Sequence, residues 1–228
     1  MSHLHVPDGV LPPIVWILGL VLAGLMLVWS AFASRRSGPQ VVAYQSALGG
    51  IMLAVMALPI PITAFDYCMT LAGPVGVLLP PAAAFQVSFV VTLMLALLGQ
   101  GGFTVVGLNA LVLGLSAVAA RPLYRATVAH WGPAPSMAFA TAVSQLAASA
   151  LWAVFLVLSI RLTPGVASEH EVEHTLLMVW RTAGVAVVVP MLLLAVAIEA
   201  LLGFGLARFL ARVRPALLPS VGDGDKIA

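Results

Sequence analysis

The first three residues, Met1, Ser2 and His3, have the composition of a metal chelate. A free α-amine, two amide nitrogens and the imidazole of a third-position histidine can close fused rings and place four nitrogens in a square plane. Ni(II) and Cu(II) prefer this geometry. If Met1 is removed, Ser2 and His3 supply three nitrogens, and His5 is a candidate for the fourth. The pattern therefore predicts a metal-binding segment within residues 1–12 and leaves the fate of Met1 open.

A second group of residues that could carry out chemistry is the run His170-Glu171-Val172-Glu173-His174. It matches the HExxH pattern of zinc peptidases. On a helix its two histidines would share one face, with Glu171 as general base. No third ligand is evident, although a catalytic zinc site uses three protein ligands in a shielded cavity. Weak gathering of cations and plain solvation of a loop are the competing interpretations. An intramembrane zinc peptidase is therefore one alternative function, and a ligand-free structural membrane subunit is another.

The rest of the chain, which must position these residues, has the composition of a membrane protein. Of 228 residues, 62% are hydrophobic and 8% are charged, whereas a soluble domain has roughly 25% charged residues. The single cysteine, Cys68, excludes an internal disulfide. The sequence has no Walker motif, nucleotide-binding glycine fingerprint or Ser/His/Asp set, so we predict no catalytic residue, no cofactor and no enzymatic activity of its own.

Apolar segments long enough to cross the bilayer predict an all-α integral membrane protein with about seven transmembrane helices. The predicted spans are Pro13–Ala33, Val41–Leu58, Met69–Leu79, Ala82–Leu98, Phe103–Ala120, Met137–Ile160 and Leu176–Ala207. The third is short for a span that needs about 20 residues. Six helices with a re-entrant segment are therefore the alternative arrangement.

The basic residues predict the orientation. With the N-terminus outside and the C-terminus inside, eight of the ten basic residues fall on the inner side, as the positive-inside rule requires. They are Arg35, Arg36, Arg121, Arg125, Arg208, Arg212, Arg214 and Lys226. Acidic and histidine side chains, Asp66 among them, then gather on the outer side. We expect one membrane domain over residues 1–218 and a short cytoplasmic tail over residues 219–228.

Polar side chains inside the predicted spans include those of Gln86, Asn109 and Glu199. Amides in apolar helices usually join one helix to another through hydrogen bonds. An intramembrane carboxyl group is costly and usually faces the interior of the bundle or a specific partner. We therefore expect these side chains to point inward, and for Glu199 a hydrogen bond between helices stands beside a functional role.

Several patches resemble the CbiM/NikM family in the order in which the family has them. The opening HVPDGVLP of His5–Pro12 resembles the family's Met-His-Ile-Pro-(Asp/Glu)-Gly-x-Leu-Pro, and Leu58–Pro61 resembles its Phe-Pro-Val-Pro. The stretch GGFTVVGLN of Gly101–Asn109 is similar to Gly-Gly-Leu-Thr-Ala-Leu-Gly-Ala-Asn. Ile198–Ala200 and Arg212–Leu218 resemble the family's Gly-Glu-Ala and its Val-Arg-Pro-Glu-Leu-Leu ending.

The resemblance implies a function and a set of partners. Members of this family are the substrate-specific membrane subunits of energy-coupling-factor (ECF) transporters for cobalt or nickel, a class of ABC transporter. It implies two cytoplasmic ATPase subunits, a coupling transmembrane subunit and, in many cases, a small auxiliary membrane protein, but no nucleic acid. It also implies a multi-pass location in the inner (plasma) membrane and a role in supplying cobalt for cobalamin biosynthesis.

The family's metal ligands are the N-terminal amine, the next amide and imidazole, and a histidine in the loop after the second helix. This chain departs from that set at two places. Leu4-His5 occupies the register of the family's initial Met-His, and Tyr67 stands where the loop histidine falls. A neutral phenol with a reference pKa near ~10 is a poor ligand for Ni(II) at pH 7.

The two departures are compatible with each other. A start of Met-Ser-His supplies four nitrogens alone, and the loop histidine is then dispensable. If the chain begins at Ser2, then His5, Asp66 or Cys68 completes the set, and Cys68 favours the softer copper ion. The candidate metal ligands are therefore Met1, Ser2, His3, His5, Asp66 and Cys68, and the candidate cargo is Ni(II) or Co(II), with Cu(II) as the third choice.

Overall fold

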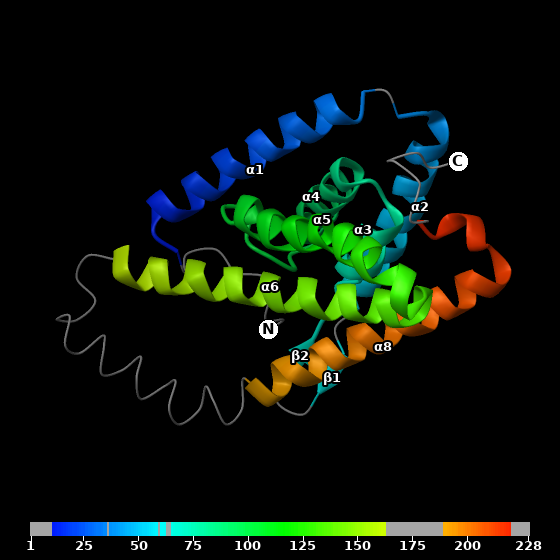
Figure 1. Cartoon of the computed structure of the whole chain (residues 1–228). Coiled ribbons are helices and arrows are strands. Elements are labelled where there is room, and N and C mark those ends of the chain that lie inside the picture. Colours follow the sequence, from blue (N-terminus) through cyan, green and yellow to red (C-terminus); the bar gives the residue numbers. More distant parts are fainter. Residues whose placement is uncertain (1–10, 36, 59, 63–64, 163–188, 220–228) are drawn as a thin grey trace.

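The computed structural model describes residues 11–35, 37–58, 60–62, 65–162 and 189–219. This part of the chain is all-α apart from one small hairpin (Figure 1). Its elements are α1 (Pro13–Ala33), α2 (Pro39–Met56), β1 (Ile60–Ile62), β2 (Phe65–Tyr67), α3 (Ala72–Leu78), α4 (Pro81–Leu97), α5 (Val106–Trp131), α6 (Pro133–Leu162), α8 (Val189–Val213) and the 3-10 turn η2 (Pro215–Leu217).

Four helices begin at a proline, namely α1, α2, α4 and α6. Proline suits this first helical position because its missing N–H would have no partner there and its fixed φ matches the helix. The prediction gave α1 its observed bounds, but it placed the starts of α2, α4 and α6 at Val41, Ala82 and Met137. Helix α2 in fact begins at Pro39, α4 at Pro81 and α6 at Pro133.

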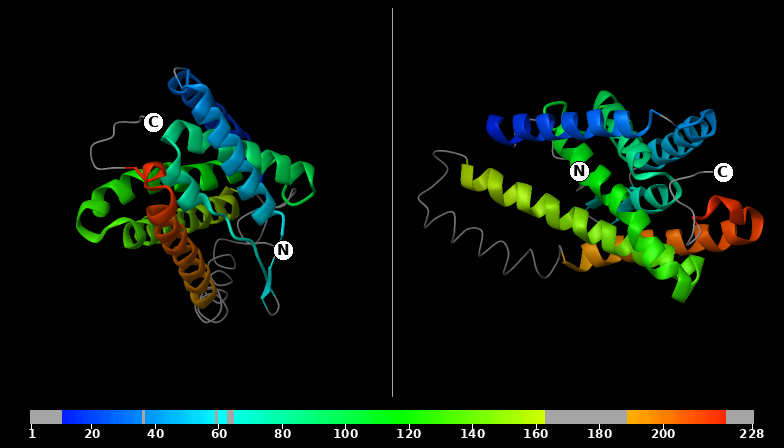
Figure 2. Two further views of the ribbon diagram at one scale, coloured as in Figure 1. Left: turned by 90° about the vertical axis from the view of Figure 1, so that its right-hand side faces the viewer. Right: turned by 45° about the horizontal axis from the view of Figure 1, so that its top comes forward.

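The described helices have the length and composition of a membrane bundle. Five are long and apolar enough to span the bilayer, and α4 is a shorter apolar helix of 17 residues. On α1, large apolar side chains such as Ile14, Leu25 and Phe32 are exposed, as expected for a surface in contact with lipid. Helix α5 is instead largely buried and lies between α1 and α6 (Figure 2). The expected all-α membrane fold is confirmed.

The third predicted span has an unusual form. Its helix, α3, has only seven residues, and the first six of them are buried. Seven residues of helix are roughly 10 Å long, against ~30 Å of hydrocarbon. Residues 68–71 before it are not helical, so the segment enters the bundle as non-helical chain followed by two turns of helix.

Contacts with α8 show the direction in which this segment runs. Thr70 is hydrogen-bonded to Glu199, and Val77 lies in the same apolar cluster as Ala207. Further along, Leu78 and Leu210 line one groove. The segment thus advances alongside α8 in the same direction. Whether it makes a seventh crossing or a re-entrant segment stays a prediction.

Helices α1, α5 and α6 fit the same alternation. In α1 and α5, Val15 packs in one cluster with Leu108, and Ala23 lies with Leu111, so the two helices run parallel. Helix α5 is also parallel to α3, because Gly76 meets Ala117 and Val77 lies with Ala120.

Helix α6 runs the other way along α8. Its residue Gln145 lies at Thr70, next to Glu199, whereas Met137 lies in the cluster of Ala207 near the far end of α8. Since α1, α3, α5 and α8 share one direction, their C-terminal ends face one side. The arginines of those ends and of the residues that follow are Arg35, Arg121, Arg125, Arg208, Arg212 and Arg214. Their predicted gathering on the inner face stays a prediction, and Arg36 and Lys226 lie outside the described residues.

Candidate functional site: the hairpin and its anchor on the last helix

Most predicted metal ligands belong to a part of the chain that the structure does not describe. Met1, Ser2, His3 and His5 precede the first described residue, Leu11. The HExxH run of residues 170–174 falls between α6 and α8, also outside the described residues. The chelate and the peptidase motif therefore both stay predictions.

The two remaining candidate ligands lie at the β1–β2 hairpin, whose strands pair antiparallel. Pro61 pairs with Asp66, and Ile60 pairs with Tyr67. Asp66 and Tyr67 thus belong to β2, and Cys68 follows it directly as a half-buried free thiol. The hairpin lies toward the end of the bundle where α8 begins (Figure 1).

Within the described ranges, no group of three or more His, Cys, Asp or Glu side chains could hold a metal ion. A transition-metal site in a protein usually takes three or four ligands. A metal site that includes Asp66 and Cys68 would therefore need further donors. The nitrogens of residues 1–5 are the other donors that the sequence predicts.

A buried polar cluster lies just beyond Cys68, where the chain enters the bundle. The Thr70 N–H donates to Glu199 Oε1 at 2.9 Å. Thr70 Oγ1 lies 3.0 Å from Oε1 and 2.9 Å from Oε2 of the same carboxyl group. Gln145 of α6 approaches the same hydroxyl, with 3.5 Å between Oγ1 and its Oε1. Thr70 and Glu199 are each 1% exposed and Gln145 is 3% exposed.

This cluster supplies hydrogen-bond partners to the non-helical part of the third span. The backbone of residues 68–71 is not helical, and lipid cannot satisfy free peptide groups. Glu199 supplies an acceptor from the middle of α8, about 15 Å along the helix from its first residue. Thr70 Oγ1 also accepts the N–H of Ala72, in the first turn of α3, at 3.3 Å. One threonine thus joins α3, α8 and the hairpin.

The next residue, Leu71, has a strained backbone. Its φ of 52° and ψ of 13° are left-handed, and it is the only non-glycine residue with positive φ among the described residues. For a residue with a Cβ this conformation costs about 1–2 kcal/mol. Such a conformation persists only where the surrounding structure enforces it. Here the enforcing contacts are those of Thr70 on one side and buried α3 on the other.

Small residues bring α3, α6 and α8 close enough for these bonds. An added Cβ at Gly73 would lie 2.6 Å from Thr141 Oγ1, and one at Gly203 would lie 2.9 Å from the same atom. Thr141 of α6 is thus held between the two glycines. Small residues at such positions allow close helix packing in membranes, and here they set the distance between Thr70 and Glu199.

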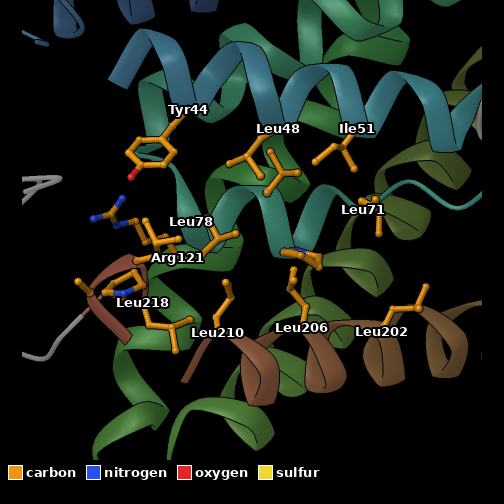
Figure 3. Close-up of a pocket in the computed structure, with 15 residues that line it drawn as sticks. Tyr44, Leu48, Ile51, Leu71, Leu78, Arg121, Leu202, Leu206, Leu210 and Leu218 are labelled. Carbon is orange, nitrogen blue, oxygen red and sulfur yellow. The ribbon is translucent and has the colours of Figure 1, made fainter. Parts of the chain in front are cut away.

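A separate apolar groove lies near the basic end of the bundle, between α2, α3 and α8 (Figure 3). Its volume is about 370 Å³. Leu202, Leu206 and Leu210 line one wall, and the guanidinium of Arg121 and the phenol of Tyr44 are the polar groups of its side-chain lining. A cationic, leucine-lined cavity does not suit a divalent metal ion, so the candidate metal site remains at the opposite end.

Sequence reasoning identified Glu199 but missed its partners. A threonine next to a short apolar segment carries no signal, and Gln145 lies in a span without any marking motif. The expectation that Gln86 joins helices is confirmed. Gln86 Oε1 accepts a hydrogen bond from Gln45 Nε2 at 2.9 Å, and its own Nε2 lies 3.4 Å from Ser34 Oγ. Asn109 is buried in α5, as expected.

Solved structures of similar fold include two transition-metal transporters. One, a truncated transition metal transporter, is 19% identical, with a TM-score of 0.73, over 91% of this chain and 98% of that chain. Another, a transition metal transporter, is also 19% identical, with a TM-score of 0.74, over 92% of this chain and 93% of that chain. At this identity the likeness establishes a shared fold.

Comparison with curated proteins gives no match. The family model for the cobalt uptake substrate-specific transmembrane region, CbiM, matches residues 5–217. That range includes every described helix, from α1 to the end of η2. The chain therefore belongs to the CbiM family and is a multi-pass membrane component of metal uptake.

Proposed function

We propose that this chain is the substrate-binding subunit of an ECF-type transporter that takes up Ni(II) or Co(II), with Cu(II) as the third candidate. The observation that supports the proposal most is the family match over residues 5–217. The location proposed is the inner membrane, with the hairpin end of the bundle facing outward and the arginine-bearing end facing the cytoplasm.

In this proposal the metal binds at the outer end. The amine, amides and imidazole of Met1–His3 supply the nitrogen donors. If Met1 is removed, one of His5, Asp66 and Cys68 completes the set. Asp66 and Cys68 support this assignment because they lie at the hairpin that precedes Thr70, whereas the groove at Arg121 is apolar and cationic.

Transport against a gradient needs an energy source, and the sequence has no nucleotide-binding motif. We therefore propose that two cytoplasmic ATPase subunits act through a coupling transmembrane subunit, with a small auxiliary membrane protein as a further partner. The arginines at the C-terminal ends of α5 and α8 are the residues proposed to meet these partners or anionic lipid headgroups.

The proposal is tested by calorimetric titration of Ni(II), Co(II) and Cu(II) into the purified full-length chain. Two forms are compared, one with a free N-terminus and one with a short N-terminal extension. We expect the extension to abolish binding, because an acylated nitrogen has no basic lone pair to give to the metal. His3→Ala should abolish it too.

A matched control is His130→Ala, which changes a histidine at the C-terminal end of α5, far from the N-terminal donors in the sequence. It should bind as the wild type does. Equal affinity in the free and extended forms would refute the chelate, and absence of binding of all three metals would refute the proposed function. The mass of the purified chain establishes whether Met1 is retained and so which donor set operates.

A further inference from the structure

The carboxyl group of Glu199 is not among the proposed chelate donors, yet it is buried at the centre of α8 and bonded to the segment that follows the candidate ligands. Three features meet there. Thr70 is held through both its N–H and its hydroxyl. Leu71 has a left-handed backbone. Cys68 lies two residues before Thr70.

We propose that Glu199 is a positioning residue for the outer hairpin: its two bonds to Thr70 enforce the turn at Leu71 and so fix where Cys68 and β2 lie. This goes beyond the proposed function, because it assigns a role to a residue of the last helix that is outside the proposed donor set. Its consequence for metal capture rests on the proposed function, whereas the positioning itself does not.

The geometry indicates that the bond from Glu199 to Thr70 does more than hold two helices together. A packing bond would join two helices whose own backbones are already satisfied. Thr70 instead lies in non-helical chain, and its N–H receives its acceptor from Glu199. The same hydroxyl then accepts the N–H of Ala72. Loss of the carboxyl group therefore leaves the N–H of Thr70 without this acceptor in the bundle interior and removes a restraint on a strained residue.

Helix α8 is well suited to hold the hairpin in place. It runs continuously from Val189 to Val213, and Gly203 packs on Thr141 of α6 one turn beyond Glu199. The hairpin segment is thus tied to a helix whose other end carries Arg208 and Arg212. A shift of α8 along its axis would move Thr70 with it, which connects the outer hairpin to the arginine-bearing end.

The lone cysteine provides a direct readout of this positioning. Cys68 is the single cysteine of the chain and is half-buried, so its rate of reaction with a maleimide reports the conformation of residues 68–71. The experiment uses the purified full-length chain without metal. Wild type is compared with Glu199→Ala, Glu199→Gln and Thr70→Val.

We expect Glu199→Ala to raise the labelling rate at least about tenfold. Glu199→Gln should stay within about threefold of wild type, because the amide oxygen can accept the Thr70 N–H and its NH₂ can donate to Oγ1. Thr70→Val keeps the N–H bond and loses the hydroxyl, so its rate should lie between the two. The matched control is Thr92→Val, which removes a buried hydroxyl that bonds within α4 to the carbonyl of Ser88 and should not change the rate.

If Glu199→Ala does not yield folded protein, the comparison of Thr70→Val with Thr92→Val decides. Labelling of Cys68 that is unchanged in Thr70→Val, or that rises equally in Thr92→Val, would overturn the proposal. So would a Gln variant that behaves like Ala, because that would require the charge and not the hydrogen bonds.

Titration with Ni(II) tests the consequence for capture. Substitution of residues that orient metal ligands typically costs 10–100-fold in affinity, and we expect a loss in that range for Glu199→Ala and near-wild-type affinity for Glu199→Gln. If wild type binds no metal, the proposed function fails and the labelling result still decides the positioning role. If wild type binds and Glu199→Ala binds equally well, the role in capture is refuted while the proposed function stands.

Discussion

Gly76 of α3 packs directly against the main-chain carbonyl of Ala117 in α5, so closely that a Cβ at Gly76 would overlap it. A backbone atom cannot rotate away as a side chain can, and the two helices would have to separate. We therefore expect Gly76→Ala to destabilise the protein by about 1–3 kcal/mol, the usual range for overpacking. Thermal unfolding in detergent measures the loss.

The control for this substitution is Gly50→Ala in α2, where an added Cβ meets nothing within 4 Å. Alanine has the higher helix propensity by roughly 0.5–1 kcal/mol, so this variant should be as stable as wild type or slightly more so. Equal melting temperatures for Gly76→Ala and Gly50→Ala would show that α3 does not pack on α5 as described.

The parallel directions of α1, α3, α5 and α8 make the orientation of the chain testable at two points. A reporter fused after Arg214 should be cytoplasmic, and a tag inserted between Val166 and Ala167 should be accessible from outside. The reason is the positive-inside rule applied to the arginine-bearing end. Accessibility of both positions from the same side would contradict seven alternating crossings.

Glu171→Gln separates uptake from peptidase activity. The substitution removes the general base that a zinc peptidase requires and keeps the size and hydrogen-bonding capacity of the side chain. We expect metal accumulation in cells to stay near the wild-type level, measured as cell-associated nickel. Proteolysis by the wild type that disappears in this variant would contradict a transport role.

Metal affinity should depend on pH with a definite sign. Metal binding requires a neutral imidazole and a neutral amine, whose reference pKa values are ~6.5 and ~7.7–8.0. Protons compete with the metal for both groups, so affinity is greatest at high pH and falls by at least about tenfold per unit below pH 6. Titrations at three pH values check this, and a flat profile would argue for carboxylate ligands such as Asp66.

The sequence predicted the helices better than it predicted how they touch. For α1 it predicted the observed bounds, because the apolar run between Pro13 and Arg35 has the length of one transmembrane helix. The prolines that begin α2, α4 and α6 were visible in the sequence, and the rule for proline at the first helical position would have corrected those starts.

The form of the third span lay beyond sequence reasoning. Hydropathy measures how apolar a segment is, and Met69–Leu79 is apolar whether it is helical or extended. The left-handed turn at Leu71 depends on Glu199, which is bonded to Thr70 across 129 positions of the chain. Such a contact has no local signature. It shows only after α3, α6 and α8 are packed through Gly73, Thr141 and Gly203.

The short third span also has a consequence for how the protein is made. During synthesis, residues 68–79 leave the ribosome long before α8 exists, and two turns of helix with non-helical peptide groups cannot settle in lipid alone. The acceptor that this segment needs, Glu199, is translated 129 residues after Thr70. Membrane integration of the third span must therefore be completed after translation of α8, and a chain truncated before Glu199 would leave the outer hairpin without its final position.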